Sequence, residues 1–160
     1  MMRRIIKVSA FCLFILICHT VWSKNGLFET NPYAVLKGYN RVRALNGKKG
    51  ELLGYIYVKN NLNYTNGVLT DLLVVKANNN KLDTLYRIDS KGFFNSQGKP
   101  ELKNTVKQYY GFKLSKELKG HTDLFSVGDV DRNGKLFSDD NDFLINWNYQ
   151  TKRFEYYPMP

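Results

Sequence analysis

The segment 71–77 (DLLVVKA) constrains the fold of this chain most, because it is apolar at four successive positions. In a β-strand, neighbouring side chains point to opposite faces, so Leu72 and Val74 share one face. Leu73 and Val75 share the other face. Because both faces are apolar, the pattern predicts a central strand that is buried on two sides.

Further short apolar segments, separated by turns rich in Gly, Asn and Lys, lie on either side of this strand in the sequence. Segments 40–45 and 52–58 are predicted strands joined by a turn at 46–50, which begins with Asn-Gly, a strong hairpin signal. Three asparagines at 78–80 form the predicted turn into another strand at 82–88. The sequence therefore predicts an antiparallel sheet of hairpins.

The segment 100–110 breaks this pattern, because its large apolar side chains fall at helical spacing. They are Leu102, Val106, Tyr109 and Tyr110. Pro100 suits the first turn of a helix and Gly111 suits its end. The predicted fold is therefore mainly β, of the α+β type, with one packed helix near 100–110. An alternative interpretation is a strand through Tyr110, Phe112 and Leu114.

The first 23 residues have the pattern of a signal peptide. A basic start, Arg3-Arg4 and Lys7, precedes an apolar run at 8–21 that is too short for a membrane-spanning helix. Val-Trp-Ser at 21–23 provides a suitable cleavage site after residue 23. An uncleaved anchor is the alternative. Removing residues 1–23 from 160 leaves 137, so residues 24–160 are predicted to form a single exported β-rich domain. Both cysteines lie in the leader, which favours a periplasmic or secreted bacterial protein without disulfides.

The net charge is +10 and becomes +7 once the three basic leader residues are removed. Lys and Arg are spread along the chain, which is typical of a solvated surface. The expected partners are an unknown protein or an anionic envelope component, such as lipopolysaccharide. Nucleic acid is not expected, because no nucleic-acid-binding motif is present, and no integral membrane protein is expected after cleavage.

Oxygen ligands crowd together between residues 129 and 142 (DVDRNGKLFSDDND). Carboxylates, an amide and one backbone carbonyl alternate there, so their oxygens can converge on one hard cation while Gly134 makes the sharp turn. The predicted metal ligands are Asp129, Asp131, Asn133, the backbone carbonyl of Lys135, and Asp140. The alternative is a turn that only caps a hairpin, because Asp, Asn and Gly favour turns in any case.

This Asp-x-Asp-x-Asn-Gly pattern resembles the calcium loops of EF-hand and dockerin proteins over about a dozen residues. The resemblance implies a Ca²⁺ site. Asp140 stands in place of the closing Glu, and Phe137 stands where a polar ligand is usual, so the expected affinity is weak. The flanks 124–127 and 143–147 have the pattern of strands, and this strand–loop–strand setting is similar to the calcium loops of FG-GAP-type propeller blades.

Segments 61–88 and 129–157 resemble each other. In each, Asn-Gly precedes an apolar hairpin, and Asp71 and Asp142 occupy equivalent places 71 residues apart. The first copy has amides where the second has acids. These features indicate a degenerate duplication of a hairpin unit. Chance similarity is the alternative, since any two strand–turn–strand units share this period.

The mature chain lacks the common catalytic motifs, including a cysteine nucleophile and a phosphate loop. Its one histidine, His121, lies two residues from Asp123, a spacing that allows a carboxylate to orient an imidazole. The sequence favours a small exported binding or interaction protein with a weak structural calcium loop, and no enzymatic activity is expected. Two alternatives are a secreted or periplasmic inhibitor or immunity-type protein and a calcium-dependent hydrolase.

Overall fold

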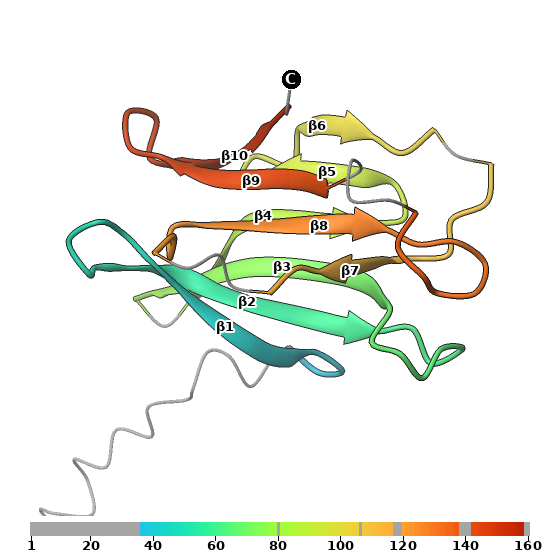
Figure 1. The fold of residues 1–160 in the computed structure, drawn as a ribbon. Coiled ribbons are helices and arrows are strands. Elements are labelled where there is room, and N and C mark those ends of the chain that lie inside the picture. The colour runs from blue at the N-terminus through green and yellow to red at the C-terminus, as the bar shows by residue number, and fades with distance from the viewer. Residues whose placement is uncertain (1–35, 80, 106, 117–119, 138–141, 159–160) are drawn as a thin grey trace, which may run out of the picture. The chain divides into compact units, whose positions relative to one another are not determined.

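Ten strands form one antiparallel sheet, so the prediction of a mainly β fold is confirmed (Figure 1). The computed structural model describes residues 36–79, 81–105, 107–116, 120–137 and 142–158, all within one compact unit, Pro32–Pro160. The predicted signal peptide, residues 1–23, lies outside the described residues. The strands are β1 (Asn40–Asn46), β2 (Leu52–Asn60), β3 (Leu69–Asn78), β4 (Lys81–Asp89), β5 (Gly92–Asn95), β6 (Pro100–Lys103), β7 (Phe112–Leu114), β8 (Leu124–Asp129), β9 (Asp142–Asn148) and β10 (Arg153–Tyr157).

The predicted hairpins form because their turn residues suit the required backbone geometry. β1 pairs with β2 across the Asn46–Gly50 turn, and Gly50 takes a positive φ of 79°. β3 pairs with β4, and Asn79 in their turn has φ 47°, the left-handed region that asparagine tolerates better than most residues. These strands agree with those predicted from the periodicity.

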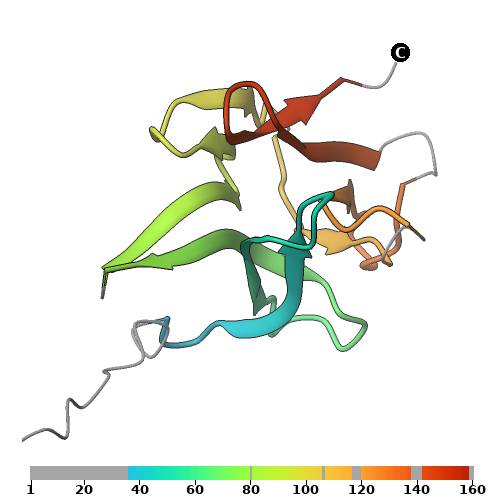
Figure 2. The ribbon, with the colours of Figure 1, turned by 90° about the vertical axis from the view of Figure 1, so that its left-hand side faces the viewer.

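β3 lies at the centre of the sheet, as its apolar sequence predicts. It pairs with β2 and β4 and, at Leu69, with β7. The long path of the sheet runs β10-β9-β8-β7-β3-β4-β5-β6, and β1 joins through β2. Viewed along the strands, these neighbours curve round into a nearly closed barrel (Figure 2).

Hydrogen bonds outside the strand ladders tie the edge strands β1 and β6 to distant parts of the chain. The Asn46 amide at the end of β1 donates to the Thr122 carbonyl over 2.9 Å, and the Thr122 hydroxyl donates back to the Asn46 carbonyl over 2.9 Å. On the other side, Glu101 of β6 accepts the Tyr156 amide of β10 over 2.8 Å and the Tyr86 hydroxyl of β4 over 2.9 Å. Burial and the neighbouring carboxylate of Glu101 raise the pKa of Tyr86, so this phenol stays protonated as a donor.

The barrel interior is filled by aliphatic and aromatic side chains. Leu72 and Val74 are completely buried, and Ile145 of β9 is buried with them in the same core. The aromatic rings of Tyr86 and Phe154 both contact Phe125 at centroid distances of 6.4 and 6.3 Å. On the other face of β3, Val75 is buried but Leu73 is only half-buried, so burial on two sides applies to part of this strand.

The predicted helix near 100–110 is wrong. Residues 100–103 form β6, which pairs with β5, and residues 104, 105 and 107–111 contain no helical turn, with Val106 outside the described residues. Asn, Thr and Tyr dominate the second half of this segment, and these residues lose side-chain freedom or hydrogen-bond locally in a helix. Leu102 and Tyr109 pack on the core from a strand and a loop instead. The alternative strand is confirmed at Phe112–Leu114, which is β7.

Candidate functional site

The predicted metal loop lies between two strands, as the flanking sequences predict. β8 ends at Asp129, and β9 begins at Asp142. Val130 and Leu136 form an antiparallel bridge, so residues 131–135 make a tight turn at the start of the connection. The Val130 amide donates to the Gly111 carbonyl over 3.3 Å, which ties the base of the turn to the start of β7.

Asp131 organises this turn through its own carboxylate. Oδ1 accepts the Asn133 amide over 2.8 Å and the Lys135 amide over 2.9 Å. These hydrogen bonds, chiefly the one from Lys135, hold the pKa of Asp131 below its usual value. The Lys135 carbonyl accepts the Asp131 amide over 2.8 Å. Each of these oxygens therefore has a partner within the turn, which is the geometry expected of a hairpin cap, and a cation would use their remaining lone pairs.

A second loop supports the turn from the side. Tyr64 and Asn66 lie in the β2–β3 connection, which belongs to the first of the two similar segments. The Tyr64 hydroxyl donates to the Arg132 carbonyl over 3.2 Å, and the Asn66 side-chain amide donates to the Gly134 carbonyl over 2.9 Å. Both segments fold as hairpins, β3–β4 and β9–β10, and the duplication stays an interpretation of the sequence.

Asp129 is set apart from the turn. It is half-buried, and burial raises the pKa of its carboxyl group. It lines a cavity that does not include Asp131. Of the five predicted ligands, Asp131, Asn133 and Lys135 therefore share one turn, Asp129 faces a different space, and Asp140 lies outside the described residues. Among the residues that the structure describes, no three His, Cys, Asp or Glu side chains are grouped closely enough to hold a metal ion.

The cavity beside Asp129 has a volume of about 180 Å³. Four aromatic residues line it, contributed by β5, the β6–β7 connection, β7 and β9. They are Phe93, Tyr109, Phe112 and Phe143. Ile88 and Leu102 add aliphatic surface, and the polar lining includes Lys103, Asn104 and Thr105. An apolar lining with a few polar groups is a composition that small-molecule sites share.

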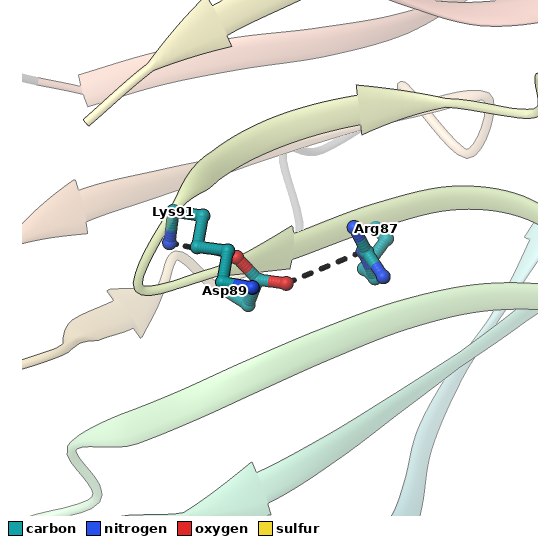
Figure 3. A network of polar contacts seen from close by, with 3 residues as sticks. All are labelled: Arg87, Asp89 and Lys91. Carbon is teal, nitrogen blue, oxygen red and sulfur yellow. Dashed lines mark hydrogen bonds and ion pairs between the residues drawn. The ribbon is translucent and has the colours of Figure 1, made fainter. Parts of the chain in front are cut away.

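A second carboxylate in this cavity, Asp89, already has partners. Its Oδ2 lies 3.3 Å from Nε of Arg87, and its Oδ1 accepts the Lys91 amide over 2.7 Å (Figure 3). Arg87 also lies over the Phe94 ring, with 4.3 Å between the guanidinium carbon and the ring centroid. The charge of Asp89 is therefore compensated by a residue of its own strand.

Asp129 and Tyr109 differ from Asp89 in this respect. Within the described ranges, no side chain makes a hydrogen bond or ion pair with the Asp129 carboxylate. The Tyr109 hydroxyl is buried and has no hydrogen-bond partner in the same part of the chain. Burial raises the pKa of Tyr109, and the carboxylates of Asp129, Asp71 and Asp89 raise it further, so the phenol is neutral at physiological pH.

The histidine singled out in the sequence lines a different cavity, of about 620 Å³. His121 and Asp123 both face this space, together with Trp147 and Tyr149. Asp123 accepts a hydrogen bond from the Tyr149 hydroxyl over 2.9 Å, and that hydroxyl in turn accepts the Lys48 amide over 2.8 Å. The carboxylate whose spacing allows it to orient the imidazole instead accepts a hydrogen bond from a tyrosine.

The aromatic lining of the Asp129 cavity could not be read from the sequence. Its members lie on separate elements between residues 93 and 143, and their spacing carries no local signal. The helical spacing predicts Tyr109 on the face of a helix. Comparison with protein-family models, with curated proteins and with solved structures gave no match. In the described part of the chain, no helix is long and apolar enough to cross a membrane.

Proposed function

We propose that this chain is a small exported binding protein that holds a small molecule in the cavity beside Asp129. One observation carries the proposal: a half-buried carboxylate without a partner among the described residues lines an otherwise largely apolar space. Partial burial leaves this carboxylate less hydrated than one on the surface, and a bound cation or hydrogen-bond donor compensates for the lost hydration. The polar groups beside the aromatic lining give a ligand an orientation.

The separation of the two cavities supports binding over the alternative of a calcium-dependent hydrolase. His121 lines one cavity and Asp129 lines the other, so the candidate base and the acidic loop do not share a substrate space. The secreted inhibitor or immunity-type alternative requires a protein partner. The cavity beside Asp129, of about 180 Å³, is too small for a protein segment of several residues and favours a small molecule instead.

The proposal is tested by amide chemical shifts of the purified protein during titration with benzylamine, benzyl alcohol and benzoate. At least one compound is expected to shift the amides of Phe93, Phe112 and Asp129 more than those of Thr122 and Trp147 in the other cavity. Thr105→Trp, which places a large ring beside the cavity, is expected to abolish these shifts. Ser96→Trp, an exposed position outside this cavity, is the matched control. If none of the three compounds affects the cavity amides, the proposed function is wrong.

We further propose that the adjoining loop binds calcium weakly and thereby orders the end of the barrel. With a Kd of roughly 0.1–1 mM, the range of extracellular calcium modules, 10 mM calcium is expected to add about 1.4–2.7 kcal/mol to the free energy of unfolding. That gain corresponds to a rise in Tm on the order of 5 °C, measured by calorimetry. Magnesium is expected to do much less, since it requires a tighter octahedral shell.

The control for the calcium response is a change of charge away from the loop. Asp131→Asn, which removes the carboxylate within the turn, is expected to abolish the rise in Tm. Asp83→Asn, which removes a carboxylate from β4, is expected to leave it intact. An identical Tm in chelator and in 10 mM calcium would mean that the loop only caps its hairpin.

A further inference from the structure

The aromatic lining of the Asp129 cavity has its own ligand preference. Phe93 and Phe143 lie with ring centroids 5.2 Å apart and planes tilted by 56°, so the two rings present different orientations. Phe112 is 1% exposed and forms part of the core beneath the cavity. Ring faces carry partial negative charge and attract cations, most strongly where water is excluded. An aromatic lining of this kind accepts the apolar part of a ligand, and any ring face within it attracts a cation.

The formal charges around the cavity point the same way. Asp129 is half-buried, and none of the described side chains pairs with its carboxylate. Asp89 is compensated by Arg87, 3.3 Å away. Among the described lining residues the one cationic side chain is Lys103, which is exposed to solvent, where water and salt screen its charge. An anionic ligand would meet Asp129 as a like charge, and a neutral ligand would displace water from that carboxylate without supplying an opposite charge.

The size of the cavity limits the apolar part of the ligand. A dry cavity of roughly 150 Å³ accepts a benzene molecule, and this cavity measures about 180 Å³. One ring, or an aliphatic group of similar volume, therefore fits beside the charged group. A larger ligand would have to extend out of the cavity into solvent.

We propose that the cavity selects a small organic ammonium ion, with the nitrogen donating to Asp129 and the apolar group packed against Phe93, Phe112 and Phe143. This inference rests on the proposed binding function and adds the chemical class of the ligand. The ammonium group replaces part of its water shell by a charge-assisted hydrogen bond to Asp129 and by the faces of the surrounding rings. Its apolar substituent removes further hydrocarbon surface from water.

The test compares the affinities of benzylamine, benzyl alcohol and benzoate, which share one ring and differ in a single group. Titrations are followed by amide chemical shifts at pH 7 in the presence of a chelator, so that no calcium ion occupies Asp129. Benzylamine is expected to bind about tenfold more tightly than benzyl alcohol, the usual gain from a hydrogen bond to a charged group. Benzoate is expected to bind most weakly of the three.

Two isosteric variants assign the preference to one carboxylate. Asp129→Asn is expected to reduce the preference for the amine to less than about threefold, since an amide supplies no charge. Asp131→Asn removes an equal charge two residues away, in the exposed turn, and is expected to leave the preference unchanged. If Asp129→Asn does not fold, the order of the three affinities in the unaltered protein still decides.

Two results would overturn the inference. If benzyl alcohol or benzoate binds the cavity as tightly as benzylamine, the site is not selective for a cation, although the proposed binding function stands. If benzylamine binds more tightly and Asp129→Asn keeps that preference, the amine is recognised elsewhere. Failure of all three compounds to reach the cavity amides contradicts the proposed function itself.

Discussion

Val74→Asp is expected to unfold the protein or to lower its Tm by tens of degrees. Val74 is completely buried on β3, where it pairs with Ile56 of β2 and Tyr86 of β4. A carboxylate placed there without a hydrogen-bond or charge partner costs several kcal/mol, a large part of the roughly 5–15 kcal/mol that stabilises a domain. Thermal unfolding followed by circular dichroism measures the effect.

Lys76→Asp is the matched control, because it introduces the same side chain two residues along the same strand. Lys76 is exposed, and its ammonium group donates to the Leu52 carbonyl over 2.8 Å. The expected loss is about 1 kcal/mol, the usual value of one solvent-exposed hydrogen bond. Equal Tm values for the two variants would contradict the placement of Val74 in the barrel interior.

Gly111→Ala is expected to destabilise the protein by several kcal/mol, because the chain is closely packed where β7 begins. Gly111 has φ 127°, a conformation that side chains rarely adopt. A Cβ atom there would collide with the Leu69 carbonyl oxygen and with Cγ1 of Val68. The same residue accepts the Val130 amide, so its displacement would also disturb the base of the Asp131 turn. Urea unfolding gives the change in free energy.

Gly98→Ala separates steric collision from backbone strain. Gly98 also has a positive φ, 72°, and no atom lies within 4 Å of the place that its Cβ would occupy. This variant therefore carries only the left-handed strain of alanine, about 1 kcal/mol. A loss for Gly111→Ala no greater than for Gly98→Ala would contradict the close approach of Gly111 to the Leu69 carbonyl.

Local sequence predicted the strands well where burial and turn chemistry agree. Residues 72–75 are apolar without interruption, and they lie on the strand that pairs with three neighbours. Asn46-Gly47 and Asn79 mark two turns that the structure contains. Each of these features acts over a few residues, so a single sequence is enough to reveal it.

The prediction of a helix near 100–110 is wrong because the helical spacing of its apolar residues is coincidental. Leu102 faces the core from β6, whereas Tyr109 reaches it from the loop before β7. Their side chains are brought to the core by separate elements, and not by one helical face. Strand pairing between Phe93 and Leu102 decides the conformation of residues 100–103, and a pairing partner cannot be identified from local periodicity.

The candidate site shows the same limit. The Asp131 turn could be predicted because its residues lie within five positions of the sequence. Asp131, Asn133 and Lys135 form one hydrogen-bonded unit. Asp129 pairs with Phe112 across β7 and β8 and shares a cavity with Phe93, and no local pattern encodes these neighbours. The sequence therefore singles out Asp129 but places it with the ligands of the Asp131 turn, whereas the structure places it in the lining of the aromatic cavity.

The contact made by Glu101 marks one of the places where the barrel is held by few hydrogen bonds. β10 and β6 are the two ends of the strand path, and a carboxylate that accepts the Tyr156 amide joins them across the gap. A single side chain joins β6 to β10 there, whereas β3 and β4 are joined by a backbone ladder along their length. Separating β6 from β10 therefore breaks far fewer hydrogen bonds than separating β3 from β4. Local fluctuations follow openings of low cost, so the Tyr156 amide is expected to exchange with solvent before the amides of β3. The opened edges are also the strands through which two copies would first pair.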